Sequence, residues 1–104
     1  MEIYDRSVAE EIDAWPLDLR SRLLHIVDRI EAHGLDRVGM PLVRHLRGKL
    51  WEMRPSGKRL EGRALYVAVE GRRIVILVAF IKKRQTTPGR MIELAEARMK
   101  ELSR

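Results

Sequence analysis

The chain has 104 residues and no Cys, and its 21 Lys or Arg against 15 Asp or Glu give a net charge of +6. This length supports a single domain over residues 1–104 and excludes an enzyme built from two lobes with a cleft between them. The absence of Cys excludes disulfides, a thiolate nucleophile and Cys-based metal sites, and the lack of a signal-peptide or membrane-spanning pattern favours a cytoplasmic protein.

A short amphipathic helix is predicted near the N-terminus. Val8, Ile12 and Trp15 recur at positions i, i+4 and i+7, which places them on one face of a helix. Ser7 is the predicted N-cap, because its hydroxyl can accept a hydrogen bond from a free amide of the first turn. Pro16 disfavours helical geometry in the residue before it, so this helix ends at Trp15 and Pro16 opens the next.

The second predicted helix carries one apolar stripe and ends at Gly34. The stripe consists of Leu19, Leu23, Ile26, Val27 and Ile30. We expect the two helices to form a hairpin. The following segment, Leu35–Lys49, has no sustained period of 3.6 or 2, which predicts an irregular connection. Long connections in small domains often carry functional residues.

Three strands are predicted after this connection. The first, Leu50–Arg54, alternates, with Trp51 and Met53 on the face that packs in the core and Glu52 on the other face. Residues 63–70 and 73–81 form the other two, joined by a turn at residues 70–72 in an antiparallel meander. The last strand is apolar on both faces, which predicts that it is central and covered on both sides.

The ends of the chain complete the predicted fold. Ile3-Tyr4 is expected to pair as a short edge strand, and Thr87 and Pro88 are the predicted N-cap and first residue of a C-terminal helix. The apolar positions of that helix recur at helical spacing: Met91, Ala95, Met99 and Leu102. The predicted fold class is α+β, with a short N-terminal strand, a helical hairpin, a three-stranded antiparallel meander and a C-terminal helix.

The positive charge is concentrated in one part of the chain. Residues 41–90 contain thirteen basic and three acidic residues, whereas residues 1–40 contain five basic and nine acidic ones. A polyanion such as RNA is the natural partner of such a segment, because each cation that neutralises a phosphate releases a condensed counterion. A solvated basic surface without a partner is the alternative interpretation.

Two arginines are the candidates for phosphate chemistry. If the strands pair as predicted, Arg54 at the end of one lies near Arg63 at the start of the next, and guanidinium groups bind phosphate through two parallel hydrogen bonds. This arrangement suits RNA cleavage, since the 2′-hydroxyl is an internal nucleophile and the enzyme needs to orient the backbone, neutralise charge and move protons. We find no metal-binding or cofactor-binding motif and expect neither a metal nor a cofactor.

Four stretches of the sequence resemble a known family. They are Leu46–Arg54 with the pattern LWExR, Gly62–Tyr66, Ile74–Pro88 with the pattern FxKK followed by TP, and Ile92–Arg98. Together they resemble the toxins of type II toxin–antitoxin systems in the RelE/ParE superfamily, most closely the HigB-like, phage-derived branch. The resemblance implies a RelE-like fold and a bacterial endoribonuclease that cleaves mRNA on the ribosome and is neutralised by a cognate antitoxin, often a helix-turn-helix protein.

The resemblance also implies roles for individual residues. The catalytic candidates are Arg54 and Arg63, as phosphate-stabilising groups, and Lys82 and Lys83, which would contact RNA or assist proton transfer. His45 is the candidate acid or base. Further RNA contacts are expected from Arg44, Arg47, Lys49, Lys58, Arg59, Tyr66 and Arg84. For Tyr66 a position in the core is the alternative, and for residues 82–84 it is a strand end kept in solution by charge.

Two other functions are compatible with the same sequence features. A ParE-like toxin shares the fold but inhibits DNA gyrase by protein contact and needs no nuclease site. A catalytically inactive domain that binds RNA or the ribosome would use the same basic residues only for electrostatic attraction. One departure from the family concerns Gln85, Thr86 and Thr87, which stand where many relatives have a further lysine.

Overall fold

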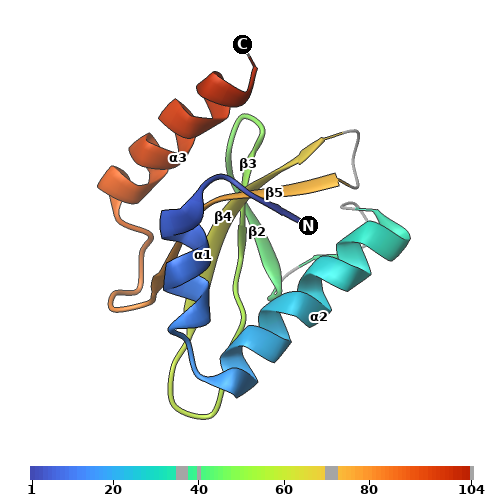
Figure 1. Ribbon diagram of the computed structural model, residues 1–104, viewed down its shortest axis with the longest axis vertical. Coiled ribbons are helices and arrows are strands. Elements are labelled where there is room, and N and C mark those ends of the chain that lie inside the picture. The colour runs from blue at the N-terminus through green and yellow to red at the C-terminus, as the bar shows by residue number, and fades with distance from the viewer. Residues whose placement is uncertain (35–37, 40, 70–72, 104) are drawn as a thin grey trace.

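The computed structural model describes residues 1–34, 38–39, 41–69 and 73–103. They form one five-stranded sheet in the order β1-β5-β4-β3-β2 with helices packed on it (Figure 1). The strands are β1 (Glu2–Ile3), β2 (Val43–Arg47), β3 (Leu50–Met53), β4 (Gly62–Val69) and β5 (Arg73–Ile81), and the helices are α1 (Arg6–Asp13), α2 (Leu17–His33) and α3 (Gly89–Leu102). The predicted α+β class is confirmed, and the described elements agree with a RelE-like fold.

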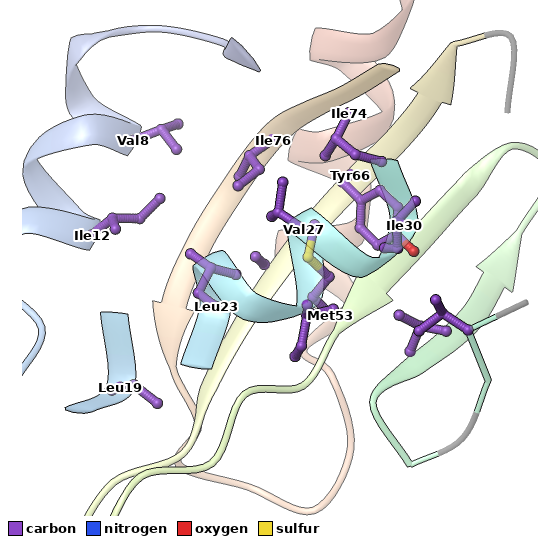
Figure 2. Packing of buried hydrophobic residues seen from close by; sticks show 14 of the residues in the cluster. Val8, Ile12, Leu19, Leu23, Val27, Ile30, Met53, Tyr66, Ile74 and Ile76 are labelled. Carbon is purple, nitrogen blue, oxygen red and sulfur yellow. The ribbon is translucent and has the colours of Figure 1, made fainter. Parts of the chain in front are cut away.

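Both faces of the sheet carry a hydrophobic core. On one face α1 and α2 bury their apolar stripes, and Leu23, Val27 and Ile30 pack against the strands (Figure 2). On the other face α3 places Ala95 over a second cluster that includes Leu65 and Leu77, among others. Because side chains alternate along a strand, β4 and β5 each supply residues to both clusters, which explains their nearly continuous apolar sequence.

The position of the last predicted strand needs a correction. β5 is buried on both faces as expected, but β4 occupies the centre of the sheet. β5 is not at the centre because only the two-residue strand β1 lies beyond it, whereas β3 and β2 lie beyond β4 on the other side. β1 pairs with β5 in parallel, with Ile3 opposite Ile76. The edge pairing expected for Ile3-Tyr4 is therefore confirmed one residue earlier, at Glu2–Ile3.

The segment 35–49 is not an irregular connection throughout. Residues 43–47 form β2, which pairs antiparallel with β3 and brings Arg44 opposite Glu52 and His45 opposite Trp51. The sequence pattern did not predict this strand, because β2 lies at the edge of the sheet, its solvent-facing residues are charged and only its first residue, Val43, is buried. The predicted turn at residues 70–72 lies outside the described residues.

Two predicted N-caps are wrong. The side chain of Asp5, rather than that of Ser7, caps α1 by accepting a hydrogen bond from the amide of Val8 at 3.1 Å. Thr87 does not cap α3, because its hydroxyl donates instead to the carboxylate of Glu52. Gly34 does end α2, at a φ of 87° that side chains other than glycine rarely adopt.

We predict that Gly62→Ala destabilises the protein by about 2 kcal/mol, because the added methyl group overfills a packed site. Its Cβ would lie 2.8 Å from Cη2 of Trp15, a buried indole held by a 2.9 Å hydrogen bond from Nε1 to Glu11. The measurement is the free energy of unfolding in urea. Gly89→Ala is the matched control, since a Cβ there meets no atom within 4 Å and alanine favours the first turn of α3. Equal effects of the two substitutions would contradict the packing argument.

No helix among residues that the structure describes is long and apolar enough to span a membrane.

Candidate functional site

The candidate site lies at the end of the sheet where β3 and β5 finish and β4 begins. Gly62 pairs with Ile81 at this end, and the amide of Lys82 donates to the carbonyl of Glu61 at 2.8 Å. The loop between β3 and β4 and the segment between β5 and α3 therefore lie at the same end of the sheet, at the bottom of Figure 1. The two stretches with the predicted catalytic residues meet here.

The predicted approach of Arg54 to Arg63 is confirmed, and a carboxylate lies between them. Nε of Arg54 is 3.8 Å and Nε of Arg63 is 3.9 Å from Oε1 of Glu52. The other carboxylate oxygen of Glu52 accepts a hydrogen bond from the hydroxyl of Thr87. Glu52 thus connects both arginines to the segment that follows β5.

This charged cluster is largely withdrawn from water. Only 1% of Glu52 and 5% of Arg63 is exposed, whereas 22% of the Arg54 side chain is. Burial is the main cause that lowers the pKa of Arg63, with the charge of Arg54 in the same direction and Glu52 opposing both. A guanidinium stays protonated in proteins, so Arg63 is a fixed positive charge at the floor of the site.

A groove of about 680 Å³ opens beside this cluster, and we call it the cationic groove. Its walls are Glu11 from α1, Arg63 from β4 and residues 80–91, which run from the end of β5 into α3. The cations that line it are Arg63, Lys82, Lys83, Arg84 and Arg90. The groove therefore presents five basic residues to a ligand, and its described lining contains one acidic residue, Glu11.

The two lysines of the groove differ in their surroundings. Lys82 is 18% exposed, and its ammonium group lies 3.0 Å from a carboxylate oxygen of Glu61, a contact whose hydrogen bond lowers the pKa of Glu61. Lys83 and Arg84 are exposed. Lys82 is thus oriented by an ion pair, while its two neighbours project into solvent at the rim.

Comparison with known protein families decides the family. Residues 10–100 match the family described as phage-derived protein Gp49-like (DUF891). The chain belongs to this family. The Gp49-like proteins are part of the RelE/HigB toxin-like superfamily and are associated with the toxins of toxin–antitoxin systems. No curated protein matches the chain.

Most of the other basic residues expected to contact RNA do not line the cationic groove of this Gp49-like protein. Arg44, Arg47 and Lys49 are exposed around β2 and the turn to β3, and Arg47 forms an ion pair with Glu96 of α3 at 2.6 Å. Lys58 and Arg59 are exposed in the loop between β3 and β4, at the same end of the sheet as the groove, but neither lines it. Of the predicted RNA contacts, only Arg84 lines the groove.

Two predictions need correction. Tyr66 is fully buried beside α2 (Figure 2), so its side chain has no surface for stacking on a base, and burial raises its pKa. His45 does not line the cationic groove, and its Nε2 is hydrogen-bonded to the carbonyl of Gly48 at 2.8 Å while its ring lies 4.9 Å from that of Trp51. This position does not support a role as acid or base.

The structure also reveals residues that the sequence analysis of the Gp49-like chain missed. A second groove, of about 230 Å³, lies between α2 and the strand ends, and we call it the α2 groove. Its lining residues are Arg22, His25, Ile26, Pro41, Leu42, Arg54, Pro55, Ser56, Glu61 and Arg63. Arg22 and His25 read as ordinary exposed helix positions in the sequence. The one signal in the sequence is that Arg22 and His25 are three residues apart, which places both side chains on the same side of a helix.

Within the described residues, no group of three His, Cys, Asp or Glu side chains is placed to hold a metal ion.

Proposed function

We propose that this Gp49-like protein is a HigB-like toxin of a type II toxin–antitoxin system that cleaves mRNA as a ribosome-dependent endoribonuclease. The observation that carries the proposal is the cationic groove, whose basic residues adjoin the Arg54–Glu52–Arg63 cluster. Fixed cations with their partners already in place can stabilise charge that develops on a phosphate without reorganising during the reaction. The association of the family with toxins is the second support.

The proposed reaction uses the RNA as its own nucleophile. The 2′-oxygen forms a bond to the adjacent phosphorus while the bond from phosphorus to the 5′-oxygen of the next nucleotide breaks. This leaves a 2′,3′-cyclic phosphate and a 5′-hydroxyl. One proton leaves the 2′-hydroxyl and another reaches the 5′-oxygen, so a general base and a general acid are needed. No metal or cofactor takes part in this scheme.

The residues of the groove divide these tasks. Arg63 on the floor and Arg54 beside it stabilise the negative charge on the phosphoryl oxygens, since both are held by Glu52. Lys82 assists proton transfer, and Lys83 contacts the RNA. Lys83 and Arg84 at the rim neutralise flanking phosphates. Lys58 and Arg59, which are exposed in the loop between β3 and β4, contact ribosomal RNA.

The partner in this proposal is a cognate antitoxin of the helix-turn-helix type. An acidic or amphipathic segment of that protein would cover the cationic groove or α3, and would thereby block access to RNA or prevent entry to the ribosomal A site.

The test maps RNA 5′ ends after brief induction, on one message with its start codon intact and on the same message with that codon destroyed. We expect cuts only on the translated copy. Lys83→Ala should reduce them about tenfold, because one phosphate contact at the rim is lost. Lys100→Ala, on an exposed position of α3 outside the groove, is the matched control. Growth arrest without cuts on either copy would reject the nuclease and favour a protein target such as gyrase.

A further inference from the structure

The α2 groove combines cations with apolar walls. Arg22 and His25 line it from α2, and Arg54 and Arg63 line it from the strand ends. The apolar part of the lining consists of Ile26, Pro41, Leu42 and Pro55. Three guanidinium groups and an imidazole next to apolar side chains match a ligand that has both an anionic group and a flat apolar surface, as a nucleotide does.

The size of the α2 groove limits the ligand. Its volume of about 230 Å³ is below the ~300–1,000 Å³ that is usual for sites that bury a whole drug-sized molecule. A single nucleotide of a longer chain is therefore a better match than a large free metabolite.

The two grooves meet at Arg63, which lines both of them. Glu61 adds a second connection, because it lines the α2 groove while its carboxylate is paired with Lys82 of the cationic groove at 3.0 Å. An RNA strand with one phosphate held at Arg63 would have its neighbouring nucleotide beside Arg54 and α2. The arrangement suits a single strand that crosses from one groove to the other.

The geometry points to the α2 groove as the subsite for the nucleotide adjacent to the scissile phosphate of single-stranded RNA. Arg22 binds the phosphate of that nucleotide, and its base lies between His25 and the apolar wall. This inference rests on the proposed nuclease function, since the scissile phosphate defines which nucleotide is adjacent. It adds a determinant of sequence preference that lies on α2, outside the cationic groove.

The test measures binding of a fluorescein-labelled, single-stranded tetraribonucleotide with 2′-O-methyl groups at every position, which prevents cleavage. Arg22→Ala should weaken binding about tenfold and reduce the slope of log affinity against log salt by about 0.7, as expected for one lost phosphate contact. His25→Ala should weaken binding about fivefold with the salt slope unchanged, because stacking is lost rather than charge. Both side chains are exposed, so truncation leaves no cavity in the core.

Matched controls lie on the same helix. Arg29→Ala and His33→Ala remove the same side chains from exposed positions of α2 that line neither groove, and we expect wild-type binding from both. Equal weakening by Arg22→Ala and Arg29→Ala would overturn the subsite, because Arg22 would then contribute only to the nonspecific electrostatic attraction of RNA and not to a specific phosphate contact. Absence of binding by the unchanged protein would overturn it as well.

The outcomes separate this inference from the proposed function. If messages are cut in cells but all four variants bind the tetranucleotide alike, the nuclease stands and the α2 subsite falls. If Arg22 controls binding but no message is cut, the nuclease falls and with it the assignment to a scissile position. If hexaglutamate binds in an Arg22-dependent way and the tetranucleotide does not, the groove holds an acidic protein segment and the nucleotide assignment is overturned.

Discussion

Arg63→Lys is expected to lower the rate of mRNA cleavage about 100-fold while the protein stays folded. The lysine keeps a positive charge for Glu52 in this buried place, where only 5% of Arg63 is exposed. It loses the planar fork that binds two phosphoryl oxygens at once, and removal of one such preorganised donor typically costs 10²–10³ in rate. The measurement is the rate of appearance of cut message in a reconstituted translation reaction.

Arg29→Lys is the control for this substitution, because Arg29 is exposed on α2 and lines neither groove. We expect it to cleave at the wild-type rate. Far-ultraviolet circular dichroism and a urea titration should show that both variants are folded. Cleavage by Arg63→Lys at the wild-type rate would contradict the assigned role, since a simple charge would then suffice.

Glu52→Gln is expected to reduce the free energy of unfolding by about 3 kcal/mol. The substitution preserves the size of the side chain but removes a negative charge that lies within 4 Å of both arginine Nε atoms. Loss of one partner of a buried ion pair leaves an uncompensated charge and typically costs 3–5 kcal/mol. The measurement is equilibrium unfolding in urea, with the slope m checked for a two-state transition.

Glu96→Gln provides the matched control, because its ion pair with Arg47 lies at the surface, where 55% of the arginine side chain is exposed. A surface pair of this kind contributes about 0–1 kcal/mol. A double-mutant cycle of Glu52→Gln with Arg63→Met should give a non-zero coupling energy. Once Arg63→Met has removed the buried positive charge, loss of the Glu52 carboxylate should reduce the free energy of unfolding by less than it does in the unchanged protein. Equal losses for Glu52→Gln and Glu96→Gln would show that burial does not strengthen the cluster.

Much of the fold could be predicted from local patterns. The bounds of β5 match the predicted residues 73–81, because an apolar run between charged residues has few alternatives, and Gly34 ends α2 as expected. The rest depended on tertiary contacts. β2 is an edge strand with just one buried residue, so its sequence pattern was too weak to predict a strand. The hydroxyl of Thr87 donates a hydrogen bond to Glu52 of β3 instead of capping the adjacent helix α3.

The candidate site was predictable only in part. The approach of Arg54 to Arg63 followed from antiparallel pairing of neighbouring strands. The burial of Glu52 did not, because a carboxylate opposite apolar residues on a strand reads as a solvent-facing position until its partners are known. The same holds for Tyr66, which the family resemblance placed among the RNA contacts, and for His25, whose groove is formed by residues distant in sequence.

The parallel pairing of Ile3 with Ile76 has a consequence for how the chain is made. These partners are 73 residues apart, so the first strand synthesised has no neighbour in the sheet until nearly three quarters of the chain has been translated. The walls of the cationic groove come later still, from residues 80–91. A nascent chain therefore completes its sheet before its groove, and a product of translation that stops between the two lacks α3, which leaves the face of the sheet around Leu65 and Leu77 uncovered.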